Sequence, residues 1–312
     1  MVHAELEIKS FLKGRRAALD PAELGLPEGL IRRRVRGLRR EEVAQLAGIS
    51  VDYYTRIEQG RAPAISDSVL AAVGRALRLS PDEVNYLHNV SGRRRGAGTH
   101  SACGTGAGAE ADGARAADGT DGAGGPGDIC GREPVQRVRP EIRQVLDALD
   151  TTVPAFIYGR CLDILAWNTL AARVSFDLDA VPDRRRNSAL LLFFDPAAKE
   201  LHPDWERLAA ETVANLRADA GRHADDPRTC EVVGELHDRS AEFRRLWQAQ
   251  GVRERCNGIK RILHPVVGEL VVSYETFRLP TDPDQVLCTY TAERGSATAR
   301  ALSRLAAPIP AA

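Results

Sequence analysis

A segment of 33 residues, 96–128, excludes one continuous core for this chain. It contains 11 Gly and 9 Ala and no Val, Ile, Leu, Met or aromatic residue. Such a composition cannot bury enough surface to offset the entropy that is lost on ordering. We therefore predict a flexible linker over residues 96–133, between an N-terminal domain (1–95) and a C-terminal domain (134–312). The 312 residues are enough for each domain to bury a core.

The net charge of zero conceals an unequal distribution. Residues 1–95 carry 17 Lys and Arg against 12 Asp and Glu, a net of +5, whereas residues 96–133 carry 2 against 6, a net of −4. A basic end on a neutral remainder is typical of a nucleic-acid-binding module joined to another domain. No apolar run reaches the roughly 18 residues that a membrane span needs, and the chain starts without an apolar signal core. We predict a cytoplasmic protein with no membrane partner.

The N-terminal domain shows helical periodicity. Leu70, Val73 and Leu77 recur at spacings of three and four behind Ser66, which is a candidate helix cap. Ser80 begins a second pattern, with proline next and glutamate three residues on, which predicts a capping box. These patterns predict an all-α domain of about five helices.

Residues 40–59 predict two short helices that cross closely. Ala44 supplies a small residue where the helices touch, and Gly48 supplies the positive φ that a tight turn between them requires. Ser50 is placed to cap the second helix. The pattern is typical of a helix-turn-helix, whose second helix enters the major groove of DNA. A helical hairpin that only packs is the alternative.

The outer face of the second helix would meet base edges, while neighbouring groups would approach the phosphate backbone. The predicted DNA contacts are Arg40, Ser50, Val51, Asp52, Thr55, Arg56 and Arg61. Asp52 either accepts a hydrogen bond from cytosine or pairs with Arg56, four residues along the helix. The Arg-rich run at 32–40 is either a stripe that binds phosphates, with affinity that falls as salt rises, or a solvated charged face.

The C-terminal domain mixes helical and alternating patterns. Helices are predicted near residues 142–149, 205–221, 240–250 and 297–306. Short strands are predicted on both sides of a turn at Gly159 and Arg160, and paired strands at 268–279 and 285–293. Helices with a small antiparallel sheet in one domain predict an α+β fold.

Signatures of catalysis and of metal binding are missing from the sequence. It contains no GxSxG or HExxH motif, its seven His are scattered, and its six Cys form no CxxC pair. The stretch 223–227, "HADDP", clusters a histidine with two carboxylates, but it follows a helical pattern that ends at Gly221. We predict a solvated loop or a helix cap there. We predict no enzyme activity, no metal site and no cofactor.

Residues 14–61 closely resemble the Xre-type helix-turn-helix domains of bacterial transcriptional regulators. The stretches "GLRREEVAQLAG" and "DYYTRIEQGR" look like one branch of these, the MmyB-like regulators. In that branch a C-terminal, PAS-like ligand-binding domain follows. The later stretches "DILAWN", "HPDWERLA", "FRRLW" and "HPVVGELVVSYETF" look like that domain, so the resemblance covers most of the chain outside the predicted linker.

The resemblance implies a pocket for a small hydrophobic molecule, acyl-chain-like or related to an antibiotic. The candidate ligand contacts are Trp167, Asn168, Phe193, Trp205, Arg217, Trp247, His264 and Tyr274, with Phe156 and Leu216 in the apolar lining. Each aromatic residue either lines the pocket or packs in the core. Arg217 either meets a ligand carboxylate or extends to solvent. His264 either contacts the ligand or satisfies a loop carbonyl, and Asn168 either caps the following helix or senses ligand.

These observations predict a DNA-binding transcriptional regulator whose C-terminal domain senses a small ligand. We expect a homodimer in which the ligand changes the fit of two helix-turn-helix units to two operator half-sites. Two alternatives remain open for the C-terminal domain. It is a dimerisation module with a filled core, or it binds a prosthetic group.

Overall fold

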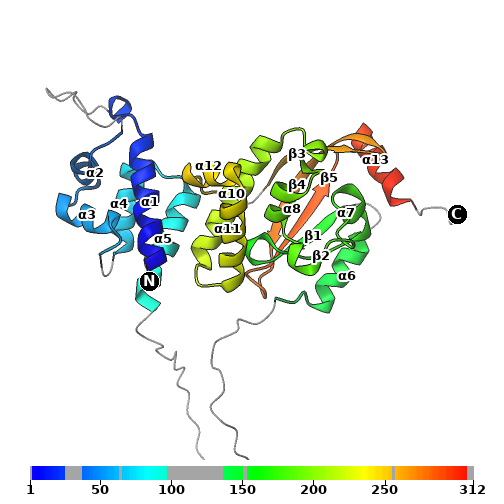
Figure 1. The fold of residues 1–312 in the computed structure, drawn as a ribbon, viewed down its shortest axis with the longest axis horizontal. Coiled ribbons are helices and arrows are strands. Elements are labelled where there is room, and N and C mark those ends of the chain that lie inside the picture. Colours follow the sequence, from blue (N-terminus) through cyan, green and yellow to red (C-terminus); the bar gives the residue numbers. More distant parts are fainter. Residues whose placement is uncertain are drawn as a thin grey trace, which may run out of the picture.

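The computed structural model describes residues 2–24, 37–62, 65–96, 136–149, 153–254 and 257–307. Within these ranges the chain forms a helical N-terminal domain and a mixed C-terminal domain that lie side by side (Figure 1). Residues 97–133 of the predicted linker and residues 32–36 of the Arg-rich run lie outside the described residues.

The N-terminal domain is built of α-helices around one apolar core. Its elements are α1 (Val2–Ala18), the 3-10 helix η1 (Pro21–Leu24), α2 (Arg40–Ala47), α3 (Val51–Glu58), α4 (Asp67–Ala76) and α5 (Pro81–Gly96). The predicted caps are confirmed, because Ser66 accepts a hydrogen bond from the Val69 amide and Ser80 exchanges two hydrogen bonds with Glu83. Phe11 and Tyr86 meet edge to face in the core, with ring centroids 5.0 Å apart.

The C-terminal domain combines helices with one sheet, which confirms the predicted α+β fold. Its helices are α6 (Pro140–Leu149), α7 (Thr169–Val174), α8 (Ser188–Phe194), α9 (Ala198–Leu201), α10 (Trp205–Arg222), α11 (Pro227–Arg239), α12 (Ala241–Gln248) and α13 (Ala297–Ala306). Its strands are β1 (Ala155–Tyr158), β2 (Ile164–Trp167), β3 (Asn257–His264), β4 (Gly268–Arg278) and β5 (Val286–Thr291). Two 3-10 helices, η2 (Arg160–Leu162) and η3 (Asp183–Arg185), complete the domain.

The five strands form an antiparallel sheet in the order β2-β1-β5-β4-β3. One face packs against α7, α8 and α13 and forms the main core of the domain, to which Ile262, Leu270 and Val272 contribute fully buried side chains. On the opposite face, α6 covers the β1 and β2 side with a smaller apolar cluster that includes Leu146 and Ile157. The β3 and β4 part of that opposite face is exposed.

Two features of the sheet differ from the sequence prediction. Strand β3 was not predicted, and it forms the edge of the sheet beside β4. Strand β2 begins at Ile164 because Cys161 and Leu162 adopt positive φ angles of 48° and 66°, which an extended strand does not permit. The predicted two-residue turn at Gly159 and Arg160 is therefore longer, and η2 occupies it.

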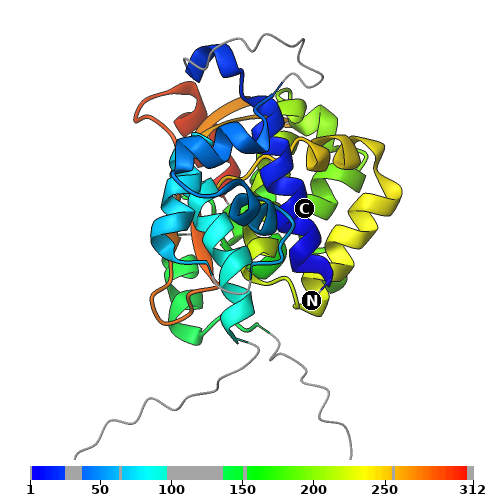
Figure 2. The ribbon, with the colours of Figure 1, turned by 90° about the vertical axis from the view of Figure 1, so that its left-hand side faces the viewer.

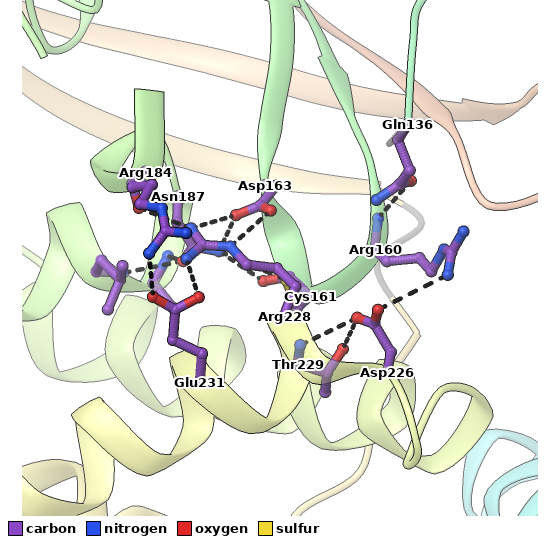
Figure 3. Close-up of polar contacts among 12 residues, drawn as sticks. Gln136, Arg160, Cys161, Asp163, Arg184, Asn187, Asp226, Arg228, Thr229 and Glu231 are labelled. Atoms are coloured by element: carbon purple, nitrogen blue, oxygen red, sulfur yellow. Dashed lines mark hydrogen bonds and ion pairs between the residues drawn. The ribbon is translucent and has the colours of Figure 1, made fainter. Parts of the chain in front are cut away.

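A polar network holds this turn (Figure 3). The Asp163 carboxylate accepts hydrogen bonds from the Arg228 guanidinium at 3.0 Å on each oxygen, and another from the Asn187 amide at 2.8 Å. Asn187 is fully buried and caps α8, and the Cys161 amide donates to Asp219 of α10. The network thus joins the β1–β2 turn to α8, α10 and α11.

The two domains contact each other through α10 of one and α5 of the other (Figure 1). Figure 2 shows the N-terminal helices in front of the C-terminal domain. Ala218 of α10 and Val252, which follows α12, belong to the same buried apolar cluster as the N-terminal core. The N-terminal domain therefore continues its core onto the surface of the C-terminal domain.

Candidate functional site

The helix-turn-helix has the geometry that its sequence predicts. Gly48 adopts φ 67° and ψ 32° between α2 and α3, and the Ile49 amide donates to the Ala44 carbonyl at 3.0 Å. Ala44 is fully buried where the helices meet. Ser50 caps α3 by accepting a hydrogen bond from the Tyr53 amide at 3.2 Å.

A buried carboxylate joins three helices of this domain, and the sequence analysis missed it. Glu58, at the end of α3, is 1% exposed. It accepts hydrogen bonds from Arg16 of α1 at 3.1 Å and from Arg40 of α2 at 2.9 and 2.7 Å. Hydrogen bonding to Glu58 raises the pKa of the Arg40 guanidinium. The signal in the sequence was the position of Glu58, four residues after the buried Tyr54 on the same helix face.

The predicted base-reading residues lie on the exposed side of α3. The side chains of Asp52 and Arg56 are 74% and 63% exposed and form an ion pair at 3.0 Å, which was one of the two alternatives for Asp52. Val51 is 42% exposed, and the Thr55 hydroxyl donates to its carbonyl at 2.8 Å. Arg61 is exposed just after α3, whereas Arg40 shares its guanidinium with Glu58.

A cavity lies between the inner face of the sheet and the helices that cover it. Water-sized molecules can occupy about 40 Å³ of it, room for a few waters, so a ligand with a hydrocarbon chain requires the lining side chains to move apart. Strands β1, β2, β3 and β5, helices α8 and α10, the segment after α7 and His202, which follows α9, contribute to it. The lining residues are Phe156, Tyr158, Ile164, Ser175, Phe176, Leu178, Ser188, Leu191, Leu192, His202, Leu208, Thr212, Lys260, Ile262 and Tyr290.

The polar part of this lining centres on Lys260 and His202. Among the residues that the structure describes, Lys260 is the one lysine or arginine in the lining and no carboxylate is present; the Lys260 ammonium donates to the Tyr290 hydroxyl at 2.8 Å. Burial and the Lys260 charge lower the pKa of His202 to about 4, so its imidazole is neutral at neutral pH. The His202 Nδ1 atom is buried without a hydrogen-bond partner. An apolar cavity with one cationic group can hold a largely apolar molecule that ends in an acidic group.

Comparison with known protein families identifies the family to which the chain belongs. The MmyB-like transcription regulator ligand binding domain matches residues 138–305, more than half of the chain. The chain belongs to the MmyB-like transcription regulators. A helix-turn-helix domain matches residues 12–87 of this MmyB-like regulator, so the predicted family is confirmed in both domains. A search of curated proteins found no match.

In the described residues of the MmyB-like regulator, none of the helices is both long and apolar enough to cross a membrane. Within the same part of the chain, no group of three or more His, Cys, Asp or Glu side chains is arranged to hold a metal ion. Asp226, in the cluster at 223–227, caps α11 by accepting a hydrogen bond from the Thr229 amide at 3.0 Å, which confirms the predicted helix cap.

The predicted ligand contacts of the MmyB-like regulator are not gathered around the cavity. Of the eight residues, none lines it, and Tyr274 lines a smaller cleft beside His202 and Lys260. Phe193, Trp205 and Trp247 instead pack with Phe243 in an aromatic cluster between α8, α10 and α12. The guanidinium of Arg186 lies over the Trp167 ring, 5.1 Å from the ring centroid. Phe156, predicted for the apolar lining, does line the cavity, whereas Leu216 is buried beside the aromatic cluster.

Asn168 is a structural junction of the MmyB-like regulator. It is 3% exposed and caps α7, as predicted, by accepting a hydrogen bond from the Ala171 amide at 3.0 Å. The same oxygen accepts from the Ala155 amide of β1 at 3.1 Å, and the side-chain amide donates to the carbonyls of Val153 at 2.8 Å and Leu146 at 3.4 Å. One side chain therefore fixes β1, β2, α6 and α7 together.

The two remaining candidates lie away from the cavity. His264 contacts the Arg173 carbonyl through Nε2 at 2.8 Å, and its Nδ1 accepts from the Val266 and Val267 amides, so it satisfies the backbone around the β3–β4 turn. Arg217 is 1% exposed, so it does not extend to solvent. It lies in the contact between the two domains, opposite Glu7 of α1.

Proposed function

We propose that this regulator binds an operator through α3 and senses a small, acyl-chain-like molecule in the cavity under the sheet. The observation that carries the ligand proposal is the cavity lining, which in the described part of the chain is mostly apolar with one lysine, Lys260, and no arginine. DNA as the partner makes the cytoplasm the expected location.

The lining supports an amphipathic ligand over a polar one. Leu178, Leu191 and Ile262 offer apolar surface to a hydrocarbon chain. A carboxylate at the end of such a chain would replace the Tyr290 hydroxyl or join it as a partner of the Lys260 ammonium. Hydrogen bonds to charged groups contribute about 1.5–3 kcal/mol, so loss of the Lys260 charge would weaken binding roughly 10- to 100-fold.

Calorimetric titration of the full chain with decanoic and tetradecanoic acid tests this proposal. Lys260→Met should weaken binding of the acid but not of the matching primary alcohol, while Lys199→Met, at an exposed lysine of the same domain, should bind both as the wild type does. Native mass spectrometry separates the alternatives, since a prosthetic group would add a fixed mass. Absence of any binding would leave a dimerisation module with a filled core.

The DNA part is tested by selecting a binding sequence from random duplexes with the purified chain. Arg56→Ala should relax specificity at one or two base positions, whereas Arg75→Ala, at an exposed arginine on α4, should not. Affinity should fall as salt rises, since each phosphate contact releases counterions. Selection that enriches no sequence would contradict operator binding.

We further propose that the protein is a homodimer that pairs through the bare part of its sheet. Ile259, Leu263, Val271 and Phe277 are 60%, 44%, 46% and 51% exposed on β3 and β4. The ion pair of Arg261 and Glu269 on the same strands offers both signs of charge, which a second copy related by a two-fold axis would complement.

Sedimentation velocity of the full chain tests the dimer. Phe277→Ser should weaken self-association, whereas Leu46→Ser, an exposed residue on α2, should leave it unchanged. A monomer at micromolar concentration, or a dimer that Phe277→Ser does not affect, would contradict this arrangement.

A further inference from the structure

Helix α10 extends from the ligand cavity to the domain interface. Leu208 and Thr212 line the cavity, and Arg217, five residues beyond Thr212, lies in the interface. At 1.5 Å per residue, the two positions are about 8 Å apart along the helix axis. A displacement of α10 at the cavity therefore reaches the interface through one rigid element.

Arg217 is buried with few of its hydrogen bonds made. Its guanidinium lies 4.0 Å from the centroid of the Trp247 ring, and Nη2 donates to the Trp247 carbonyl at 2.5 Å. Nη1 lies 3.7 Å from the Glu7 carboxylate of α1. The buried Nε and Nη1 atoms have no hydrogen-bond partner. A guanidinium has five N–H donors, so burial of this one is only partly compensated.

Glu7 carries the charge that offsets Arg217, and it comes from the other domain. The Tyr86 hydroxyl of α5 donates a hydrogen bond to the same Glu7 carboxylate. Burial raises the pKa of Tyr86, which keeps its hydroxyl protonated as a donor. Glu7, Tyr86 and Arg217 thus join α1, α5 and α10 at one point.

Close packing surrounds this point. A Cβ atom on Gly221 of α10 would lie 2.4 Å from the Tyr86 ring, so the helices approach as closely as they do because that position is glycine. Arg15 of α1 donates to the Gln250 carbonyl at 2.9 Å, and the Glu254 amide donates to Asp82 of α5 at 3.0 Å. These contacts fix one arrangement of the two domains, which we call the docked state.

Helix α1 connects the interface to the DNA-reading helix. The helix that carries Glu7 also carries Arg16, whose guanidinium donates to the buried Glu58 of α3 at 3.1 Å. Movement of α1 relative to α10 would therefore carry α3 with it.

Two opposing contributions set the stability of the Arg217–Glu7 contact: the attraction between the charges and the hydration that both groups lose on burial. Burial of an ion pair loses the hydration of both groups, and attraction offsets that loss only when hydrogen bonds are complete. Here the carboxylate is 3.7 Å away and two guanidinium nitrogens make no hydrogen bond. Undocking would return these groups to water, so the pair itself adds little net stability to the docked state, and a shift of α10 that moves Arg217 would change this balance.

We propose that Arg217 and Glu7 form a latch between the domains, and that ligand in the cavity controls it through α10. The latch rests on the proposed function, since it is the route by which that cavity would act on α3. In the docked state α3 is held in one orientation relative to the C-terminal domain. In the released state the helix-turn-helix domain reorients, and the spacing of two such units in a dimer changes.

Two variants of the full chain break the latch in different ways. Glu7→Gln removes the charge opposite Arg217 and leaves an oxygen for Tyr86, whereas Gly221→Val places a branched side chain against the Tyr86 ring. Glu242→Gln is the matched control, because Glu242 pairs with Arg245 on the surface of α12. Hydrogen exchange of α5 and α10 and small-angle X-ray scattering report docking. Operator affinity is measured with and without tetradecanoic acid.

Both latch variants should exchange faster in α5 and α10 and scatter as more extended particles. The ratio of operator affinities with and without the acid, expected to be about 5- to 150-fold in the wild type, should fall toward one. The control should behave as the wild type, and the acid should still bind to both latch variants.

Unchanged exchange and scattering in both variants would overturn the latch. So would faster exchange with an affinity ratio that stays at the wild-type value. These results differ from failure of the proposed function, in which the wild type itself would not bind the acid or an operator.

Discussion

Replacement of Asn168 by Asp should destabilise the C-terminal domain, although both side chains can cap a helix. The oxygen of Asn168 accepts hydrogen bonds from the Ala155 and Ala171 amides, and a carboxylate would keep both. The side-chain amide donates to the Val153 and Leu146 carbonyls at 2.8 and 3.4 Å. In Asn168→Asp, a carboxylate oxygen replaces the side-chain nitrogen and faces both carbonyl oxygens with no proton to donate.

The expected magnitudes follow from the burial of the site. Asn168→Ala leaves two buried amide donors without an acceptor, at about 1–3 kcal/mol each, so the total loss should be about 3–5 kcal/mol. Asn168→Asp should lose about 2–4 kcal/mol at pH 8, because it keeps these donors paired but places a buried charge against two carbonyls that have lost their donor.

The Asp variant should also respond to pH. Burial and the two carbonyls raise the pKa of the introduced carboxyl in the folded state above the unfolded value of about 3.9. The folded state then binds more protons between these two values, so stability decreases as pH rises through that window. The deficit relative to wild type should therefore be smaller at pH 5 than at pH 8.

Tryptophan fluorescence during urea unfolding measures this effect in the full chain. The three tryptophans, at 167, 205 and 247, all lie in the C-terminal domain, so the signal reports that domain. Asn257→Asp, at an exposed asparagine of β3, is the control. If Asn168→Asp unfolded with the wild type while Asn168→Ala was destabilised, the cap alone would matter and the argument from the two carbonyls would be wrong.

Three further predictions concern single side chains. Burial lowers the pKa of His202 from about 6.5 to about 4 in the folded state. The free energy of unfolding should therefore fall by about 3 kcal/mol as pH decreases through that window. In His202→Gln, the pH dependence of thermal unfolding should be flatter. Asp163→Asn should lose about 1.5–3 kcal/mol in urea unfolding followed by tryptophan fluorescence, because it removes the charged hydrogen bonds from Arg228, and an unchanged midpoint would contradict this. Glu58→Gln should weaken the joint of α1, α2 and α3 and lower operator affinity in a gel-shift titration, whereas Glu41→Gln, at an exposed position of α2, should not.

The helix-turn-helix could be predicted in detail because its determinants are local. Gly48, Ser50 and Ala44 act within one turn or one helix contact of their own positions, and the Asp52–Arg56 pair follows from helical spacing alone. The same holds for Asn168, whose cap of α7 involves the next three residues. The family was predicted from stretches of this kind in both domains.

The rest depends on contacts between distant parts of the chain. The alternatives considered for Arg217 were a ligand and solvent, because its partner Glu7 is in the first helix and no spacing relates the two. The cavity lining comes from eight separate parts of the chain, which a local pattern does not bring together. Strand β3 was missed because, as an edge strand with exposed Ile259 and Arg261, it lacks the apolar density of an interior strand.

The glycine at position 221 has a consequence for exchanging domains between relatives. Its fit against Tyr86, with the Glu7–Arg217 pair beside it, makes the two domains matched parts and not interchangeable modules. A chimera that joins a foreign helix-turn-helix to residues 136–307 would carry the DNA specificity of its donor. It would regain ligand control only if the donor's first and last helices presented a carboxylate and a flat ring to α10 at these places.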